Sequence, residues 1–192
     1  MFIRSERLFL RPTWPEDWSE LHSLINDEAL ARHLARVPWP YRADDARAYV
    51  GMPQAPRHPH FLITLPDLHG ADGGARVIGA VGFADCEGQA ELGYWIAREH
   101  WNRGYGTEAA RAALTLARAL GHCRIVSSHF VDNAASGRVL AKLGFVPTGQ
   151  ARLRHSPARG RADLTLGYAL ELCPSASDPA DPDDPAMLKR AA

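Results

Sequence analysis

Two glycines stand one residue apart at the start of a helical pattern in 99-EHWNRGYGTEAARAALTLARALG-121. Because they lack side chains, Gly104 and Gly106 let the backbone turn tightly and leave its N–H groups uncovered. A helix start also carries partial positive charge, so these amides favour an anion. The pattern predicts a phosphate-type site around residues 103–107, although an ordinary strand-to-helix turn is the simpler interpretation of a lone glycine pair.

Two other phosphate-binding motifs are alternative interpretations of the same glycines. Gly104, Gly106 and Ala109 also satisfy the dinucleotide fingerprint GxGxxG/A. That fingerprint opens a βαβ unit directly after an apolar strand, whereas here the preceding strand pattern carries Glu91 and a polar REHWNR insert intervenes. A Walker loop is excluded because no Lys-Ser or Lys-Thr pair follows the glycines.

A second block of residues suited to chemistry is 132-DNAASGRVLAKLGFVPTG-149. Asn133 is a good helix N-cap, and Ser136 follows three residues later. Val139, Leu140 and Leu143 recur at helical spacing, and Gly144 is a suitable end for the helix. The block predicts a helix over residues 134–143 that begins with an amide and a hydroxyl.

The elements that must position these two blocks follow from periodicity. Thr13 and Glu16 have the spacing of a capping box, with Pro15 in the first turn of a helix. The connection 67–74 is rich in Gly and Asp, which favours an antiparallel hairpin. Strands are predicted at 7–12, 60–66, 76–85, 90–97, 124–130, 145–150 and 164–170, and further helices at 18–27, 28–36, 44–50 and 107–120. This order predicts an α/β fold, a mixed sheet with helices packed on it.

Both motifs together resemble the GCN5-related N-acetyltransferases, and within them the branch that acetylates the N-termini of ribosomal proteins. The resemblance rests on WNRGYGTEA, on N-x-x-S followed by KLGF, and on the opening ERLFLRP with WPEDW, so that it covers roughly residues 5–170. It implies a single domain with a mostly antiparallel, twisted, seven-stranded sheet, splayed central strands and four to five helices. It also implies that relatives often pair as dimers, which leaves a homodimer open.

The resemblance implies that the anion is the diphosphate of acetyl-CoA, with no metal required. The residues expected at this cofactor are Trp95, Ile96, Trp101, Asn102, Arg103, Gly104, Tyr105, Gly106, Thr107, Asn133, Ser136 and Lys142. One departure is Trp101, which stands where the family usually has Gln or Arg.

Transfer of an acetyl group to an amine requires that the amine lose a proton and that the thiolate be stabilised as it leaves. Glu91 is the candidate base, directly or through water, and a surface glutamate is the alternative interpretation. Many relatives supply a Tyr as the acid where this chain has Leu140, which leaves Ser136 as the candidate acid. Ser136 completing only the helix cap is the alternative.

The acceptor amine is less defined. Trp14, Trp18, Trp39, Pro38, Pro40 and Tyr41 are candidate walls of its pocket, with core packing favoured for Trp18. The stretch 152–161 holds four arginines and is expected to be a loop, either solvated or attracting an acidic partner. Three function classes stay open: acetylation of a protein N-terminal amine, acetylation of a small amine such as a polyamine, amino acid or aminoglycoside, and non-catalytic acyl-CoA sensing.

Composition sets the remaining expectations. The 192 residues are 46% hydrophobic, which fits one domain over residues 1–172 and a disordered Pro/Asp/Ala-rich tail over 173–192. The 22 basic and 22 acidic residues balance, so neither DNA nor a membrane surface is an expected partner. The N-terminus lacks a long apolar run, which favours a cytoplasmic location. Cys86, Cys123 and Cys173 suggest reduced thiols with no disulfide, and the scattered histidines suggest no metal site.

Overall fold

A computed structural model describes residues 1–66 and 75–173. Its centre is a sheet of eight strands in the order β1-β2-β3-β4-β5-β6-β8-β7. Every neighbouring pair is antiparallel except β5 and β6, which are parallel. The predicted α/β class is confirmed, and one strand more than expected is present because the two-residue β1 (Ile3–Arg4) pairs with β2.

The N-terminal elements build one half of the sheet and the helices beside it. They are β2 (Phe9–Arg11), α1 (Trp18–Ile25), α2 (Glu28–Ala31), α3 (Ala43–Val50), β3 (His60–Pro66), β4 (Ala75–Cys86) and β5 (Gln89–Ile96). The expected antiparallel pairing of β3 with β4 is confirmed. The predicted connection at 67–74 lies outside the described residues.

The C-terminal elements build the other half. They are α4 (Tyr105–Ala119), β6 (Arg124–Phe130), α5 (Ala134–Lys142), β7 (Val146–Ser156) and β8 (Arg161–Glu171). Gly121 and Gly144 follow α4 and α5 with φ of +80° and +87°, a backbone conformation that favours glycine, so both predicted helix ends are confirmed. Residues 174–192, nearly all of the expected tail, lie outside the described part of the chain.

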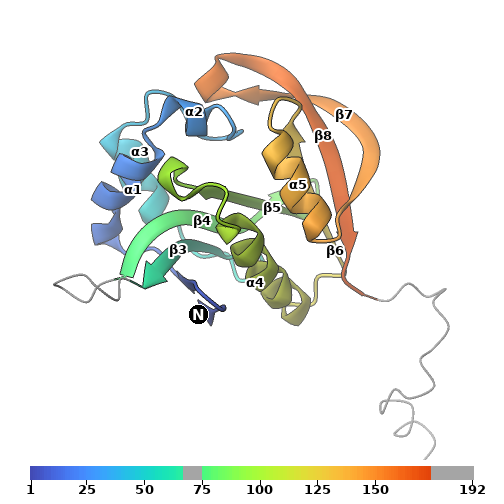
Figure 1. Ribbon diagram of the computed structural model, residues 1–192, viewed down its shortest axis with the longest axis horizontal. Coiled ribbons are helices and arrows are strands. Elements are labelled where there is room, and N and C mark those ends of the chain that lie inside the picture. Colours follow the sequence, from blue (N-terminus) through green and yellow to red (C-terminus); the bar gives the residue numbers. More distant parts are fainter. Residues whose placement is uncertain (67–74, 174–192) are drawn as a thin grey trace, which may run out of the picture.

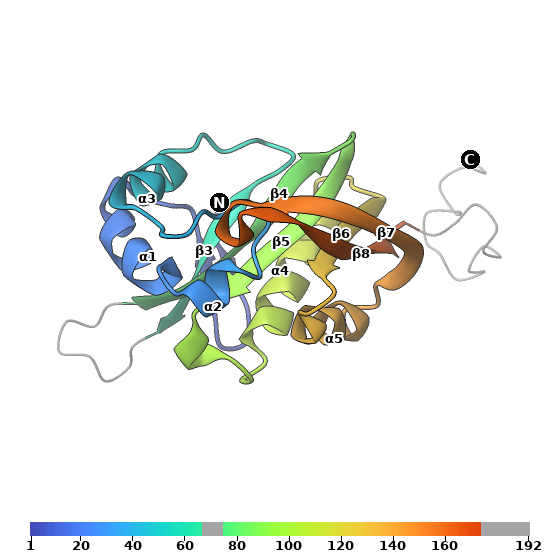
Figure 2. The same ribbon diagram turned by 90° about the horizontal axis from the view of Figure 1, so that it is seen from above.

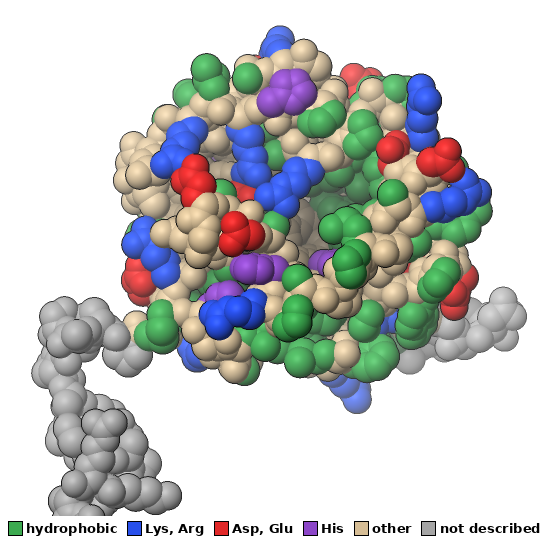
Figure 3. Space-filling model, turned by 180° about the vertical axis from the view of Figure 1, so that it is seen from behind, with side chains coloured by type: hydrophobic (Ala, Val, Ile, Leu, Met, Phe, Trp, Pro, Cys, Tyr) green, Lys and Arg blue, Asp and Glu red, His purple; other side chains and the backbone are tan. Residues whose placement is uncertain are grey.

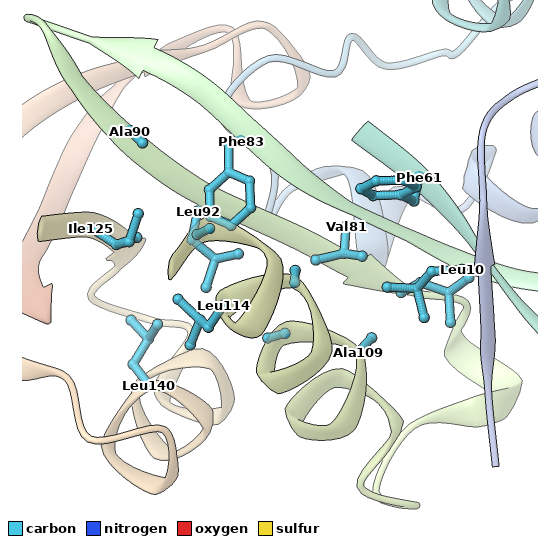
Figure 4. Packing of buried hydrophobic residues seen from close by; sticks show 14 of the residues in the cluster. Leu10, Phe61, Val81, Phe83, Ala90, Leu92, Ala109, Leu114, Ile125 and Leu140 are labelled. Carbon is cyan, nitrogen blue, oxygen red and sulfur yellow. The ribbon is translucent and has the colours of Figure 1, made fainter. Parts of the chain in front are cut away.

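Helices cover the two faces of the sheet (Figures 1 and 2). On one face α4 and α5 pack over strand residues that include Val81, Leu92 and Ile125, with Ala109 and Leu114 of α4 against them (Figure 4). The alanines of α4 let the helix lie close to the sheet. On the other face Leu21, Ala46 and Val50 of α1 and α3 pack against the opposite sides of β3, β4 and β5.

The sheet separates between β5 and β6. These strands are paired only at Ala90 with Ile125 and at Glu91 with Val126, at the start of each strand. One further contact, from Ser127 Oγ to the carbonyl of Leu92 at 3.0 Å, joins them beyond that point. Because the backbones then diverge, the C-terminal half of β5 is paired with β4 on one edge and with no strand on the other, which leaves that second edge accessible to a ligand.

Three local expectations were wrong. The first helical turn, Pro15–Asp17, is a 3₁₀ helix, and its cap is Asp17, which accepts from the Trp14 N–H at 2.6 Å. The expected capping box of Thr13 and Glu16 is absent, because the Thr13 hydroxyl donates to the Val50 carbonyl. The predicted helix over 28–36 ends at Ala31, within one turn of its Asp27 cap. Most of the arginine stretch 152–161 is strand β7, followed by a 3₁₀ turn at Pro157–Arg159.

The expectation of three reduced thiols was also wrong. Cys123 and Cys173 form a disulfide across a sequence separation of 50, and Cys86 is free. The separation hides that these cysteines flank neighbouring strands: Arg124 pairs with Glu171, and the N–H of Leu172 donates to Cys123 at 2.7 Å. No helix in the described ranges is long and apolar enough to cross a membrane.

Candidate active site

The glycine turn has the geometry of an anion site. Gly104 has φ of +80° and Asn102 has φ of +59°, and α4 begins directly after them. The first hydrogen bond of α4 runs from the N–H of Glu108 to the carbonyl of Gly104. Within the described residues, the N–H groups from Asn102 to Thr107 therefore have no acceptor and form a row of free donors at the positive end of the helix.

Only one of the two glycines is required by its backbone conformation. Gly106 is helical, and a Cβ on it would meet Tyr94 at 3.5 Å and Ile96 at 3.7 Å, which is ordinary contact. Gly106 thus faces the strand beneath it rather than the free amides. The turn is also braced by Arg7, which donates to the Arg103 carbonyl at 3.1 Å and pairs with Glu108 at 2.7 Å.

A groove of about 320 Å³ begins at this turn. It brings together eleven of the twelve residues expected at the cofactor, namely Trp95, Ile96, Trp101, Asn102, Gly104, Tyr105, Gly106, Thr107, Asn133, Ser136 and Lys142. Arg103 is not part of the lining. The indole of Trp101 donates to the Ile96 carbonyl at 2.6 Å, so this side chain fixes the end of β5 instead of supplying the charge that relatives have there.

The start of α5 closes the groove. Asn133 caps the helix by accepting from the Ser136 N–H at 3.2 Å, as predicted. Its amide also donates to the Ser136 hydroxyl oxygen at 3.1 Å. Because the hydroxyl oxygen already accepts, its own hydrogen is free to be donated to another group. Ser136 therefore serves the cap and also faces the groove.

A second cavity, of about 510 Å³, is lined by residues of β4, β5 and β6 and of the helices beside them. It shares His33, Leu34, Tyr94, Trp95 and Ser136 with the groove, so the two spaces meet at these residues. Its walls are mostly apolar, and His33, His58, His60 and His129 also line it. Figure 3 shows a face hollowed near its centre, with histidines beside the hollow and basic side chains along one side of it.

The expected walls of this cavity were mostly wrong. Tyr41 lines it, but Trp14, Trp18, Pro38, Trp39 and Pro40 do not. Trp18 packs against the core formed with α1 and α3, as favoured from the sequence. Trp14 and Trp18 also lie under the guanidinium groups of Arg11 and Arg47, each 4.0 Å from the ring centre. Sequence spacing could not distinguish these uses, because a tryptophan fits a pocket wall and a cation–π pair equally well.

Glu91 lies in the cavity where β5 and β6 begin to separate, and it is 9% exposed. Arg154 of β7 binds both carboxylate oxygens, one of them at 2.9 Å, and Arg36 reaches the same oxygen at 3.2 Å. Burial raises the pKa of Glu91, but the hydrogen bonds and charges of Arg154 and Arg36 outweigh it and hold the pKa below its ordinary value. This geometry favours an anchor for two arginines over a proton acceptor.

A second arginine of the 152–161 stretch lies outside the cavity lining and fixes the end of the β7–β8 hairpin. Arg159, with a side chain 4% exposed, binds Asp132 at 2.8 Å and Asp163 at 2.9 Å and donates to the Arg32 carbonyl. Ser156 donates to the Leu34 carbonyl at 3.1 Å. The tip of the β7–β8 hairpin is thereby fixed to the segment after α2 (Figure 1). The described residues contain no group of His, Cys, Asp and Glu arranged to hold a metal ion.

Several lining residues were not selected from the sequence. Tyr94 lies in the same strand motif as Trp95, so that motif was a usable signal for it. His33 and Arg36 come from the loop after α2 and Arg154 from β7, and none of the three belonged to a motif. Their placement depends on the β7–β8 hairpin and on the loop after α2 meeting above β5.

Two curated relatives of this chain come from Bacillus subtilis (strain 168). The uncharacterized N-acetyltransferase YoaA is 40% identical over 81 residues, which cover 40% of this chain and 46% of that protein. The putative ribosomal N-acetyltransferase YdaF is 28% identical over 158 residues, 77% of this chain and 82% of that protein. The solved structure of RimL, a ribosomal L7/L12 alpha-N-protein acetyltransferase in complex with coenzyme A, has the same fold, with a TM-score of 0.69, 23% identity and coverage of 89% of this chain and 98% of that one.

The family assignment follows from a match over most of the described sequence. Residues 7–146 match the acetyltransferase (GNAT) domain, and both motifs of the resemblance lie in that range. The free amides of the glycine turn and the groove beside β5 fit the family's acyl donor, acetyl-CoA. The chain therefore belongs to the GNAT acetyltransferase family and is an acyltransferase that uses acetyl-CoA as donor.

Proposed function

We propose that this chain transfers the acetyl group of acetyl-CoA to the N-terminal amine of a protein or peptide. The observation that carries the proposal is the pair of spaces that meet at Tyr94, Trp95 and Ser136. The groove leads from the free amides of the glycine turn to this junction. The larger space of about 510 Å³ reaches it from the other side and opens to solvent, which suits the end of a chain whose remainder stays outside.

The apolar lining supports the same acceptor. A first side chain of the peptide would lie against residues such as Leu21, Val37 and Phe83, while its amine reaches the junction. The relatives described as ribosomal acetyltransferases, YdaF and RimL, support a protein acceptor as well.

The reaction then needs few groups. The amine nitrogen attacks the thioester carbonyl carbon, the carbon–sulfur bond breaks, and the electron pair leaves with sulfur. We assign the Ser136 hydroxyl as the donor that stabilises that thiolate, because its oxygen accepts from Asn133 and its hydrogen is free. Glu91 is held by Arg154 and Arg36, so we assign it the positioning of the acceptor wall and leave proton removal to water.

A thiol-release screen tests the proposal. Wild-type protein with acetyl-CoA is offered short peptides with free N-termini, the same peptides with blocked N-termini and an internal lysine, and polyamines, amino acids and aminoglycosides. We expect release with free N-termini and an acetyl group on the α-amine by mass spectrometry. Thiol release with small amines but not with peptides would show that the acceptor is a small molecule. Acetyl-CoA binding by calorimetry with no thiol release in the presence of any amine would indicate a sensor.

A further inference from the structure

His33 occupies the junction of the two spaces. It follows α2 in the chain, and it lines both the groove and the space of about 510 Å³ that we propose for the acceptor, here called the acceptor cavity. The ring lies beside Trp101, with centroids 6.3 Å apart, and its own backbone N–H donates to Leu30. The side chain therefore enters the space where the thioester and the amine must meet, although no motif of the sequence marked it.

The two ring nitrogens differ in their surroundings. Nδ1 is buried and has no hydrogen-bond partner among the described residues. Nε2 is not among the buried unpartnered atoms and bonds to no described group, so it is the ring nitrogen that a molecule bound in the junction can reach. A buried N–H without an acceptor is rarer in proteins than a buried acceptor without a donor. The ring proton is therefore assigned to Nε2, where it can be donated into the junction.

The surroundings of the ring also favour its neutral form, because they lower the pKa of His33. The charged groups that face it are Arg32 on its own segment, Asp132 after β6 and Arg159 on the β7–β8 turn. Burial lowers the pKa of His33, and Arg159 and Arg32 lower it further against the opposing effect of Asp132. Protonation would place a second N–H at the buried Nδ1 position, where no acceptor is present among the described residues.

We propose that His33 is a catalytic residue that donates its Nε2–H to the carbonyl oxygen of the acetyl-CoA thioester. As the amine nitrogen bonds to the carbonyl carbon, the π electrons move to that oxygen, and the hydrogen bond strengthens with the developing negative charge. When the intermediate collapses, the pair returns to form C=O, the carbon–sulfur bond breaks with its electrons leaving on sulfur, and the extra proton of the amine nitrogen passes to water. No proton leaves His33. This role rests on the family's acyl transfer and not on the class of acceptor.

Three variants separate a donor from a base. His33→Gln keeps an N–H near the position of Nε2, while His33→Phe and His33→Met fill the space without a donor. We expect kcat to fall about 100-fold in His33→Phe and His33→Met, and the kcat of His33→Gln to be at least tenfold higher than in those two variants. The KM for acetyl-CoA should stay within about threefold of wild type in all three. His155→Phe, an exposed histidine on β7, is the matched control and should behave as wild type.

The pH profile provides the second readout. A neutral donor predicts that kcat shows no limb caused by His33, so wild type and His33→Gln should have parallel profiles between about pH 5.5 and 8. The proposal is overturned if His33→Phe and His33→Met keep wild-type kcat, or if the kcat of wild type falls on the acidic side of this range in a limb that His33→Gln removes, as a base would require. Circular dichroism and titration with acetyl-CoA show whether each variant is folded. If His33→Phe does not fold, His33→Met and His33→Gln are compared with each other.

Discussion

At the scale of single residues, Glu91 shows how burial and pairing decide a role. Its carboxylate is 11% exposed as a side chain, and its partner Arg154 is 28% exposed. A carboxylate whose oxygens already accept from two arginines and Ser128 has little capacity left for a proton from an amine. The residue type and strand position of Glu91 were visible in the sequence, but its partners come from residues 36 and 154.

Replacing Glu91 by Gln should therefore lower stability. At pH 7 we expect a loss of about 1–3 kcal/mol in the free energy of unfolding, because Arg154 loses its counter-charge. The folded pKa of Glu91 lies below its unfolded value, so its stabilisation is present at neutral pH and is lost as the pH falls through the folded pKa. The difference between wild type and variant should shrink in acid, as measured by urea unfolding at pH 7 and near pH 4.

Glu87→Gln is the matched control for that measurement. Glu87 pairs with Arg152 at 3.3 Å, but the two side chains are 77% and 61% exposed. Exposed pairs contribute little, so the control should not change the unfolding midpoint measurably. Equal effects in the two variants would show that Glu91 acts as a surface charge.

Gly93 gives a separate test of the acceptor cavity. It lines that cavity and not the groove, and a Cβ on it would meet nothing within 4 Å. Gly93→Ala and Gly93→Val should fold normally and reduce kcat/KM for the acceptor progressively, about tenfold for Val, because the added atoms occupy the cavity. Acetyl-CoA affinity by calorimetry should stay constant, and a fall in that affinity alone would place Gly93 at the donor.

At the scale of elements, the glycine turn was the most predictable feature. Gly104 and the cap at Asn133 were read correctly because their signals are local: a backbone conformation and a side chain reaching three residues along the chain. The arginine stretch was misread because its charges suggested solvent. Arg154 and Arg159 are instead satisfied by Glu91 and Asp132, which are 63 and 27 residues away.

Substitutions at the two glycines should have opposite outcomes. Gly104→Val forces a β-branched residue toward negative φ, which turns the row of free amides, so acetyl-CoA affinity by calorimetry should fall at least tenfold. Gly106→Ala places a methyl group at ordinary contact with Tyr94 and should keep the affinity within about threefold. Both variants should retain the circular dichroism spectrum of wild type. Unchanged affinity in Gly104→Val would refute the amide site.

At the scale of the whole molecule, the two halves of the sheet share few direct contacts along β5 and β6. Other connections compensate: α4 packs against β4 and β5, and the β7–β8 hairpin reaches back to the segment after α2 through Ser156 and Arg159. The sequence predicted the element order but not these long-range contacts, because periodicity identifies a buried face and not its partner. The acceptor cavity exists only where these segments meet, which is why its walls were mispredicted.

The Cys123–Cys173 disulfide joins the ends of the C-terminal half. The 50-residue separation encloses β6, α5, β7 and β8, and therefore Ser136, Arg154 and Arg159. Closing a loop of that length restricts the unfolded chain and is worth about 4 kcal/mol in the chain-entropy model. Cys173→Ser should lower the free energy of unfolding by up to that amount and make stability insensitive to dithiothreitol, whereas Cys86→Ser should keep the sensitivity of wild type. Three reactive thiols in native, unreduced wild type would contradict the pairing. A loss of acyl transfer that parallels the loss of stability would show that this half must be held together for Ser136 to face the groove.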